Sequence, residues 1–233
     1  MENFFFKIIT KFGSPKHKRA AARFYFASQI KKGQLKSAEI EWHQLANWVK
    51  EGDFVIDIGA NIGRYTLKLS GLVGKTGQVL SLEPMKFAFD YLTYFQSKGF
   101  FFNNVILLNI AASNQNGLVN FSVNPGPGNY LFETFTQSKI TNFGVETNTD
   151  TTLAIQIDSL NLTRKVKLIK IDVEGHELEV LNGMKNLLQV HMPVMIIENL
   201  EDNSGIVEFL TEYGYTPTKI SDTSRNTVFV VNQ

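Results

Sequence analysis

The stretch FVIDIGANIGRYTLKLSGLV, residues 54–73, joins a strand pattern to a helical pattern through a glycine-rich turn. Its first five residues are apolar except for Asp57, as in an interior strand, and from Arg64 apolar residues recur at helical spacing. A strand, a glycine turn and a helix place backbone N–H groups and a helix amino end beside a ligand. The stretch therefore predicts a ligand-binding turn made by Gly59, Ala60, Asn61 and Gly63.

Strand and helix patterns alternate along the rest of the chain. The expected helices are the amphipathic segment 38–50, residues 64–73 and 86–99, one helix from 177 to about 188, and residues 204–214. The expected strands are residues 54–60, 78–84, 105–113, 166–172 and 193–199, with a closing pair near 216–221 and 227–232. This alternation predicts an α/β fold with a mostly parallel sheet and helices on both of its faces.

Composition narrows the function classes. The chain has 233 residues, 43% of them apolar and none of them cysteine, which excludes disulfides, thiol nucleophiles and zinc–thiolate sites. No apolar run approaches the ~18 residues that a membrane-spanning helix needs. Lys7 and Lys11 interrupt the apolar start, so it is a poor signal peptide. The expectation is a soluble, cytoplasmic protein.

The first 36 residues carry nine Lys/Arg and one acidic residue, so they are strongly basic while the remainder is acidic. We expect residues 1–50 to form a helical extension and residues 51–233 the main domain. The extension serves either as a lid over the substrate or as a peripheral contact with an anionic membrane. Its apolar stripe would consist of Phe4, Phe5, Ile8, Ile9 and Phe12.

Residues 124–152 interrupt the strand–helix alternation. They are rich in Asn, Thr and Gly and contain two closely spaced prolines. An insertion of this length in a compact domain is usually a functional lid or a disordered segment. An added hairpin is the other interpretation, because strand patterns flank the insertion on both sides.

The turn's spacing identifies the expected ligand. Gly59 and Gly63 are four residues apart and Asn61 stands between them, so the dinucleotide pattern G-x-G-x-x-G is absent. Asp57 would repel phosphate but suits a cationic amino acid. Glu83 ends the next strand 24 residues after Gly59, a spacing at which a carboxylate can accept both ribose hydroxyls. A nucleoside carrying an amino acid, S-adenosylmethionine, fits these features.

A second stretch, VKLIKIDVEGHELEVLNGM at residues 166–184, brings ionisable groups to the end of another interior strand. Asp172 ends that strand, and Lys170 shares its face and pairs with it or with another buried acid. Gly175 permits a turn that places Glu174 and His176 over the same crevice. An alcohol acceptor must lose its proton, so Asp172, His176, Glu174 and Lys170 are the candidate catalytic residues. Capping of the following helix is the structural alternative for Glu174 and His176.

The sequences DIGANIGRYTL, VLSLEP, NIAAS, IDSL and IKIDVEGHELEVLNGM, in this order, resemble the FkbM family of S-adenosylmethionine-dependent methyltransferases. The resemblance implies a Rossmann-like class I methyltransferase fold with a seven-stranded sheet. It implies O-methylation of a hydroxyl on a sugar, glycan or secondary metabolite. It places Asp57, Gly59, Asn61 and Gly63 at the methionine part of the cofactor, with Ala60 beside them, Glu83 at the ribose, and Pro84 with Ala111 at the adenine.

Several alternatives remain beside this prediction. Asp172, Glu198 and Asn199 could supply oxygen ligands to Mg²⁺, which is a secondary hypothesis. A scaffold that binds the cofactor without turnover is the non-enzymatic alternative, and a peptide or lipid is the other class of acceptor. A nucleic-acid partner is not expected, because an Asn/Asp-Pro-Pro-aromatic stretch does not follow the strand that ends at Asp172.

Overall fold

The computed structural model describes residues 14–122, 139–144, 150–198, 204–218, 220–221 and 224–231. The predicted apolar stripe of the first 12 residues, most of the 124–152 insertion, and Asn199 lie outside these described ranges. None of the described helices has the length and apolarity that a membrane crossing requires.

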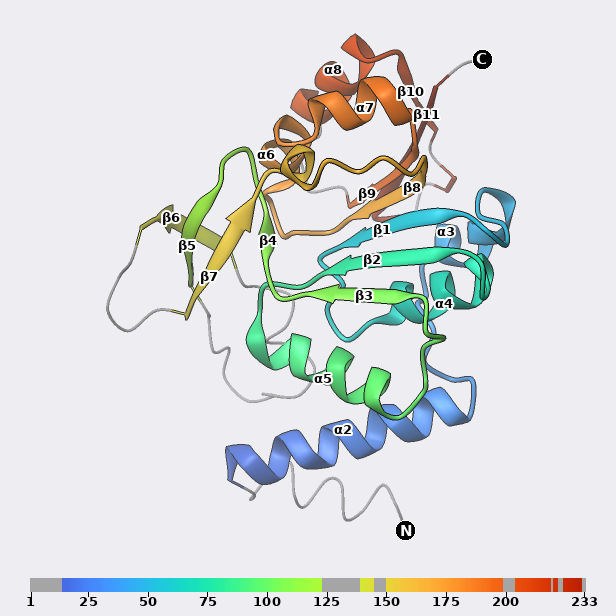
Figure 1. The fold of residues 1–233 in the computed structure, drawn as a ribbon, viewed down its shortest axis with the longest axis vertical. Helices are drawn as coiled ribbons and strands as arrows, with labels where there is room; N and C mark the ends of the chain where they lie inside the picture. Colours follow the sequence, from blue (N-terminus) through green and yellow to red (C-terminus); the bar gives the residue numbers. More distant parts are fainter. Residues whose placement is uncertain are drawn as a thin grey trace.

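A seven-stranded sheet forms the centre of the molecule (Figure 1). Its strand order is β10-β11-β9-β8-β1-β2-β3, and only β11 runs antiparallel to its neighbours. The strands are β1 Phe54–Ile58, β2 Gln78–Leu82, β3 Val105–Leu108, β8 Val166–Ile171, β9 Val194–Glu198, β10 Tyr215–Thr218 and β11 Asn226–Val231. The predicted α/β fold with a mostly parallel, seven-stranded sheet is confirmed.

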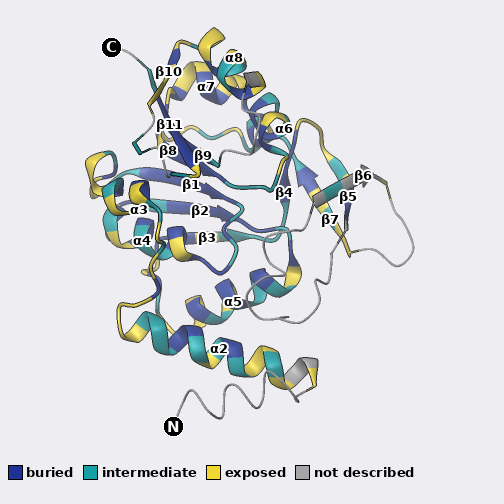
Figure 2. Ribbon diagram, turned by 180° about the vertical axis from the view of Figure 1, so that it is seen from behind, coloured by how far each residue is buried: buried dark blue, intermediate teal, exposed yellow. Residues whose placement is uncertain are grey.

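Helices cover both faces of the sheet, and the central strands are buried between them (Figure 2). One face carries α2 Pro15–Lys31, α3 Ile40–Gln44, α4 Arg64–Val73 and α5 Lys86–Ser97. The other carries α6 Glu177–Asn182, α7 Lys185–His191 and α8 Ser204–Glu212. The alternation within β8 follows from this layering: Leu168 joins the first core, whereas Ile169 and Ile171 join the second.

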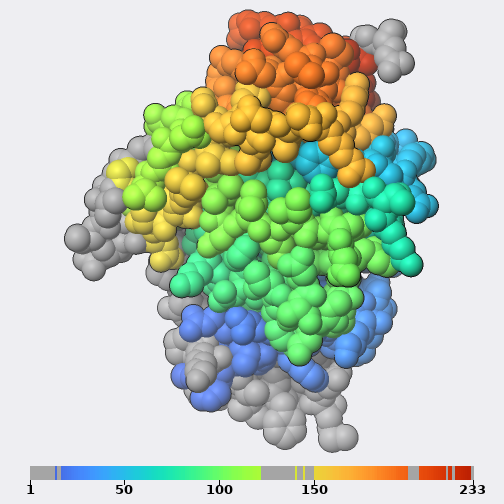
Figure 3. All heavy atoms as spheres, in the orientation of Figure 1, coloured from blue at the N-terminus to red at the C-terminus, as the bar shows by residue number. Residues whose placement is uncertain are grey.

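Helix α2 of the basic extension lies against α5 rather than across the crevice. The rings of Phe26 and Tyr91 are 5.8 Å apart, and Arg23 Nη2 lies 3.5 Å from Asp90 Oδ2. In the space-filling view the blue surface of α2 borders the green region that contains α5 (Figure 3). The expected helix in residues 38–50 is short, with α3 followed by a 3₁₀ turn at Leu45–Asn47.

Two expected elements are divided. Residues 105–113 form β3 and then β4 Ala111–Ala112, which leaves the main sheet for a second one ordered β4-β7-β5-β6. The second sheet contains β5 Gly117–Ser122, β6 Lys139–Phe143 and β7 Asp150–Ile155, so strands that flank the insertion pair with each other. The single helix expected after residue 177 is divided at Gly183 into α6 and α7, and a Cβ at Gly183 would lie 1.9 Å from the backbone oxygen of Ser113.

Candidate active site

Two adjoining cavities open at the carboxyl ends of the parallel strands, where ligands bind in open α/β sheets. The first has an empty volume of about 600 Å³, part of it open to solvent, and is lined in part by Glu83, Pro84, Ala111 and His176. The second, of about 390 Å³, is lined in part by Asp57, Ala60, Lys170 and Glu39. Gly59, Asn61 and Asp172 border both cavities.

Seven of the eight predicted cofactor residues line one cavity or both. The eighth, Gly63, lines neither cavity and packs against Leu92.

The glycine turn is held against the end of β8. Gly59 has φ +78°, and a Cβ at this position would lie 1.8 Å from the backbone oxygen of Asp172. The N–H groups of Gly59 and Ala60 both donate to the Leu82 carbonyl at 3.0 Å. The turn therefore brings the ends of β1, β2 and β8 together, and only glycine fits at its first position.

Glu83 is fixed by the backbone around it. Its two carboxylate oxygens accept N–H hydrogen bonds from Asn61 at 2.7 Å and from Met85 at 2.8 Å. Burial raises the pKa of Glu83 to about 7, although these two hydrogen bonds oppose the rise. A carboxylate oxygen has more than one lone pair, so each can accept a further hydrogen bond from a ribose hydroxyl.

Buried charges line the second cavity. Asp57 is 0% exposed; its Oδ2 accepts a hydrogen bond from Thr66 Oγ1 at 2.6 Å, and its Oδ1 has no partner among the described residues. Lys170 Nζ lies 2.6 Å from Asp172 Oδ2 and 4.8 Å from the centre of the Tyr65 ring. Burial raises the pKa of Asp57 despite the nearby Lys170 ammonium. An unpaired buried carboxylate oxygen calls for a cationic or hydrogen-bonding ligand, which fits the ammonium group of S-adenosylmethionine.

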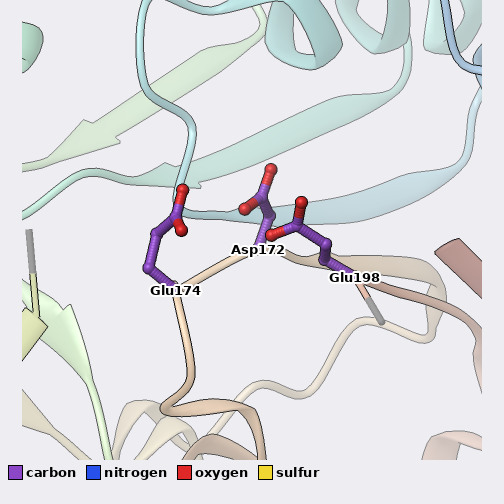
Figure 4. A group of neighbouring side chains, drawn as sticks. All are labelled: Asp172, Glu174 and Glu198. Atoms are coloured by element: carbon purple, nitrogen blue, oxygen red, sulfur yellow. The ribbon is translucent and has the colours of Figure 1, made fainter. Parts of the chain in front are cut away.

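Three carboxylates converge beside Asp172. One oxygen each from Asp172, Glu174 and Glu198 lies within 4.8 Å of the other two, and the three side chains come together in Figure 4. Glu174 reaches this position from a left-handed backbone conformation, φ +55°, which is uncommon for a residue other than glycine. The magnesium hypothesis therefore has Glu174 as a third described ligand candidate, whereas Asn199 lies outside the described residues.

The carboxylates of this cluster titrate differently. Burial, the contact with Asp172 and the charge of Glu174 raise the pKa of Glu198 to about 8. Burial also disfavours the charged form of Asp172, but the Lys170 ammonium and the contact with Glu198 together outweigh burial and hold the pKa of Asp172 below its usual value. Near neutral pH the pair therefore carries a proton on Glu198 and a negative charge on Asp172.

His176 lines the first cavity and is the N-cap residue of α6. Its Nε2 is 2.9 Å from Ser113 Oγ, and its Nδ1 is 3.6 Å from Glu179 Oε2. Burial lowers the pKa of His176, against the attraction of Glu179 and Glu177, so the ring is neutral at neutral pH. Its side chain does not cap the helix; the turn is held instead by Glu177 Oε1, which accepts the N–H groups of Val173 and Gly175 at 3.2 Å.

Several lining residues were not foreseen from the sequence. Ser37 and Glu39 reach the second cavity from the extension, whereas its long helix α2 contributes no described residue to the lining of either cavity. Phe121 and Ile140 reach the first cavity from the second sheet. Their positions depend on how distant elements dock, and no local motif marks them.

The strand order, the glycine turn and the ribose-type carboxylate define a Rossmann-like methyltransferase fold. The family model for the methyltransferase FkbM domain matches residues 57–217, and the chain belongs to that family. It is therefore a methyltransferase, and S-adenosylmethionine is the expected methyl donor.

Individual relatives are more distant. Hexuronic acid methyltransferase AglP of Haloferax volcanii is 29% identical over 185 residues, which cover 79% of this chain and 72% of the relative. The crystal structure of methyltransferase FkbM from Methylobacillus flagellatus has a TM-score of 0.58 at 14% identity, covering 98% of this chain. The match spans 57% of that longer chain. A candidate rRNA methylase from Clostridium thermocellum has a TM-score of 0.52 at 13% identity, covering 82% of this chain and 93% of its own. These two structural similarities concern the fold alone.

Proposed function

We propose that the protein transfers the methyl group of S-adenosylmethionine to a hydroxyl group of a sugar, either free or within a glycan. The observation that carries the proposal is that Asp172 borders both cavities. A donor that spans the cavities from Glu83 to Asp57 would bring its sulfonium group to the carboxylate side of the crevice. The sugar class is supported by the relative from Haloferax volcanii, whose name assigns it a hexuronic acid.

The donor supplies an activated methyl group, and the chain's own residues align the acceptor and take up its proton. As the new C–O bond forms and the C–S bond breaks, the hydroxyl proton passes to the Asp172 carboxylate. Lys170 fixes the direction of that carboxylate through its 2.6 Å contact. Glu174 adds negative charge beside Asp172, Glu198 is protonated near neutral pH, and His176 is the second candidate base.

A hydroxyl acceptor agrees better with this site than a carboxylate acceptor. The negative charges of Asp172 and Glu174 would repel a uronate carboxylate, and Lys170, the nearby ammonium, is already bound to Asp172. A sugar ring with its hydroxyl toward Asp172 and any carboxylate turned outward avoids this repulsion.

Methyl transfer from radiolabelled S-adenosylmethionine tests the proposal directly. The acceptors are neutral sugars, hexuronic acids and oligosaccharides that contain them, with a peptide pool and a lipid extract as the alternative classes. The label on a sugar product should resist mild alkali, because methyl ethers are stable to it whereas methyl esters are hydrolysed. Label that alkali releases would identify a carboxylate acceptor, and label on peptide or lipid alone would contradict the sugar assignment.

A metal ion is the secondary hypothesis for the same cluster. Mg²⁺ held by Asp172, Glu174 and Glu198, with Asn199 as a further candidate, would lower the pKa of a bound hydroxyl. The Lys170 ammonium already neutralises part of the cluster's charge, so we expect activity to survive exhaustive treatment with EDTA. Loss of activity that added Mg²⁺ restores would reverse this order of preference.

The basic extension has its own proposed roles. Arg19, Phe24 and Lys31 are exposed on α2 and Lys32 directly after it, and Phe24 retains 66% of its accessible surface. This surface suits contact with an anionic membrane. Within the extension, Ser37 and Glu39 are the residues proposed to act as the lid, because they line a cavity. Co-sedimentation with vesicles containing phosphatidylserine, lost at high salt, would support the membrane contact; a protein that remains in the supernatant would oppose it.

A further inference from the structure

Glu41 is a fully buried carboxylate in the extension, outside the 57–217 family match. It lies in the first turn of α3 and is 0% exposed. Its carboxylate accepts hydrogen bonds from Asn226 Nδ2 and from Ser224 Oγ, the latter at 2.8 Å. Asn226 begins β11 and is 2% exposed. One buried side chain thus fastens the amino-terminal extension to the last strand of the sheet.

The segment that Glu41 fastens reaches the second cavity. Ser37 and Glu39 lie in the cavity lining, and the N–H of Glu39 donates to Ser37 Oγ at 3.3 Å. The hydroxyl of Tyr65 donates to Glu39 Oε2 at 2.5 Å. The other side of this contact leads to the catalytic cluster, because Lys170 Nζ lies 4.8 Å from the Tyr65 ring centre.

The charges of the second cavity match one end of the proposed donor. Asp57 presents a buried oxygen without a described partner, and Glu39 adds a second carboxylate, which together suit an ammonium group. Arg64 also lines this cavity and suits a carboxylate. A ligand that carries both an ammonium and a carboxylate group, as an amino acid does, satisfies both sets.

We infer that Glu41 is a positioning residue for the amino-acid end of the methyl donor. By joining α3 to the start of β11, it holds Glu39 and Ser37 against the cavity in which that end lies. This inference rests on the proposed function, because it takes S-adenosylmethionine as the ligand. It adds that donor affinity depends on a segment outside the family match.

Two ligands distinguish a positioning role of Glu41 from a role in the general stability of the fold. S-adenosylhomocysteine carries the amino-acid end, whereas 5′-methylthioadenosine has the same adenine, ribose and sulfur without it. For Glu41→Ala we expect the Kd of S-adenosylhomocysteine to rise about tenfold or more, the effect of losing hydrogen bonds to a charged group. We expect the Kd of 5′-methylthioadenosine to stay within about twofold, since Glu83 and the adenine side are untouched. Calorimetry measures both constants.

Conservative and remote variants serve as controls. Glu41→Gln keeps an oxygen for Asn226 and an amide that can donate to Ser224, so its Kd for S-adenosylhomocysteine should stay within about threefold of the wild-type value. Leu210→Ala removes core volume under α8, away from both cavities; it should lower Tm and leave both Kd values unchanged.

The outcomes are distinct. Equal weakening of both ligands by Glu41→Ala, or unchanged affinity for both, overturns the positioning role. If Glu41→Ala does not fold, Ser224→Ala removes one of the two hydrogen bonds and should weaken S-adenosylhomocysteine alone, about threefold; unchanged affinity there overturns the inference. Failure of the wild-type protein to bind S-adenosylhomocysteine would instead contradict the proposed function.

Discussion

The crevice has two halves that are built in different ways. At the ends of β1 and β2, the contacts are made with backbone groups: Gly59 leaves no room for a Cβ, and two N–H groups hold Glu83. At the ends of β8 and β9, side chains contact one another, as Lys170 does with Asp172. The first half, which we assign to the donor, tolerates little change in shape. The second half, which we assign to the acceptor, depends on the balance of its charges.

The largest effect is expected where the donor half is tightest. Gly59→Ala would place a Cβ 1.8 Å from the Asp172 carbonyl oxygen, at φ +78°. The left-handed conformation alone costs roughly 1–2 kcal/mol for a residue other than glycine, and relieving the clash requires the ends of β1 and β8 to separate. We expect no measurable binding of S-adenosylmethionine by calorimetry.

Gly33→Ala is the matched control for that substitution. Gly33 has a similar φ of +65°, and a Cβ there would meet no atom within 4 Å. Its cost should be limited to the conformational term, with a modest fall in Tm and an unchanged donor Kd. Equal effects of the two substitutions would show that the close contact at Gly59 is unimportant for binding.

The acceptor half should respond in rate rather than in donor affinity. Asp172→Asn keeps the shape of the side chain but removes the carboxylate that takes the proton, so we expect kcat to fall roughly 10²–10⁴-fold. His176→Ala should lower kcat less than about tenfold, because both ring nitrogens face local partners, Ser113 and Glu179. Initial rates with saturating donor measure both variants. The reverse order of effects would make His176 the base and leave Asp172 as a positioning residue.

This contrast also explains what could be predicted from the sequence. Gly59, Asn61 and Glu83 could be predicted to lie at the crevice because a turn and a strand end are specified by short, local spacing. The pairing of Lys170 with Asp172 followed from the alternation of a strand. In contrast, the need for glycine at position 183, between α6 and α7, arises from its close approach to the backbone of Ser113, which is distant in sequence.

The rest of the site could not be predicted from the sequence, because it depends on contacts between elements that are distant along the chain. Glu39 belongs to a pattern that reads as an ordinary amphipathic helix, and only the folded chain shows that it lies 2.5 Å from the Tyr65 hydroxyl. Glu174 was predicted to lie over the crevice, but its approach to Glu198 depends on the adjacency of β8 and β9. Residues 105–113 read as one strand because β3 and β4 are both apolar, although they belong to different sheets.

The last predicted effect concerns the carboxylate that closes the donor half. Removing the charge by Glu83→Gln should weaken S-adenosylmethionine by about 1.5–3 kcal/mol for each charge-assisted hydrogen bond to the ribose that is lost. Calorimetry measures this loss. Unchanged affinity in a folded variant would contradict the ribose assignment and weaken the donor proposal as a whole.

The titration of Glu83 gives the same prediction a second, independent readout. Its pKa of about 7 lies above the ordinary 4.5, so the folded apo-protein binds the proton more tightly than the unfolded chain. The contribution of Glu83 to stability therefore falls as pH rises from 4.5 through 7. Ribose hydroxyls donate to the ionised form of Glu83 and lower this pKa, so donor affinity should rise over the upper part of that pH window.

Near pH 7, donor binding should release up to about half a proton. This release is measured as a binding enthalpy that changes with the ionisation enthalpy of the buffer. Glu83→Gln should abolish this release, and a release that persists in the variant would assign the proton to another group, such as Glu198.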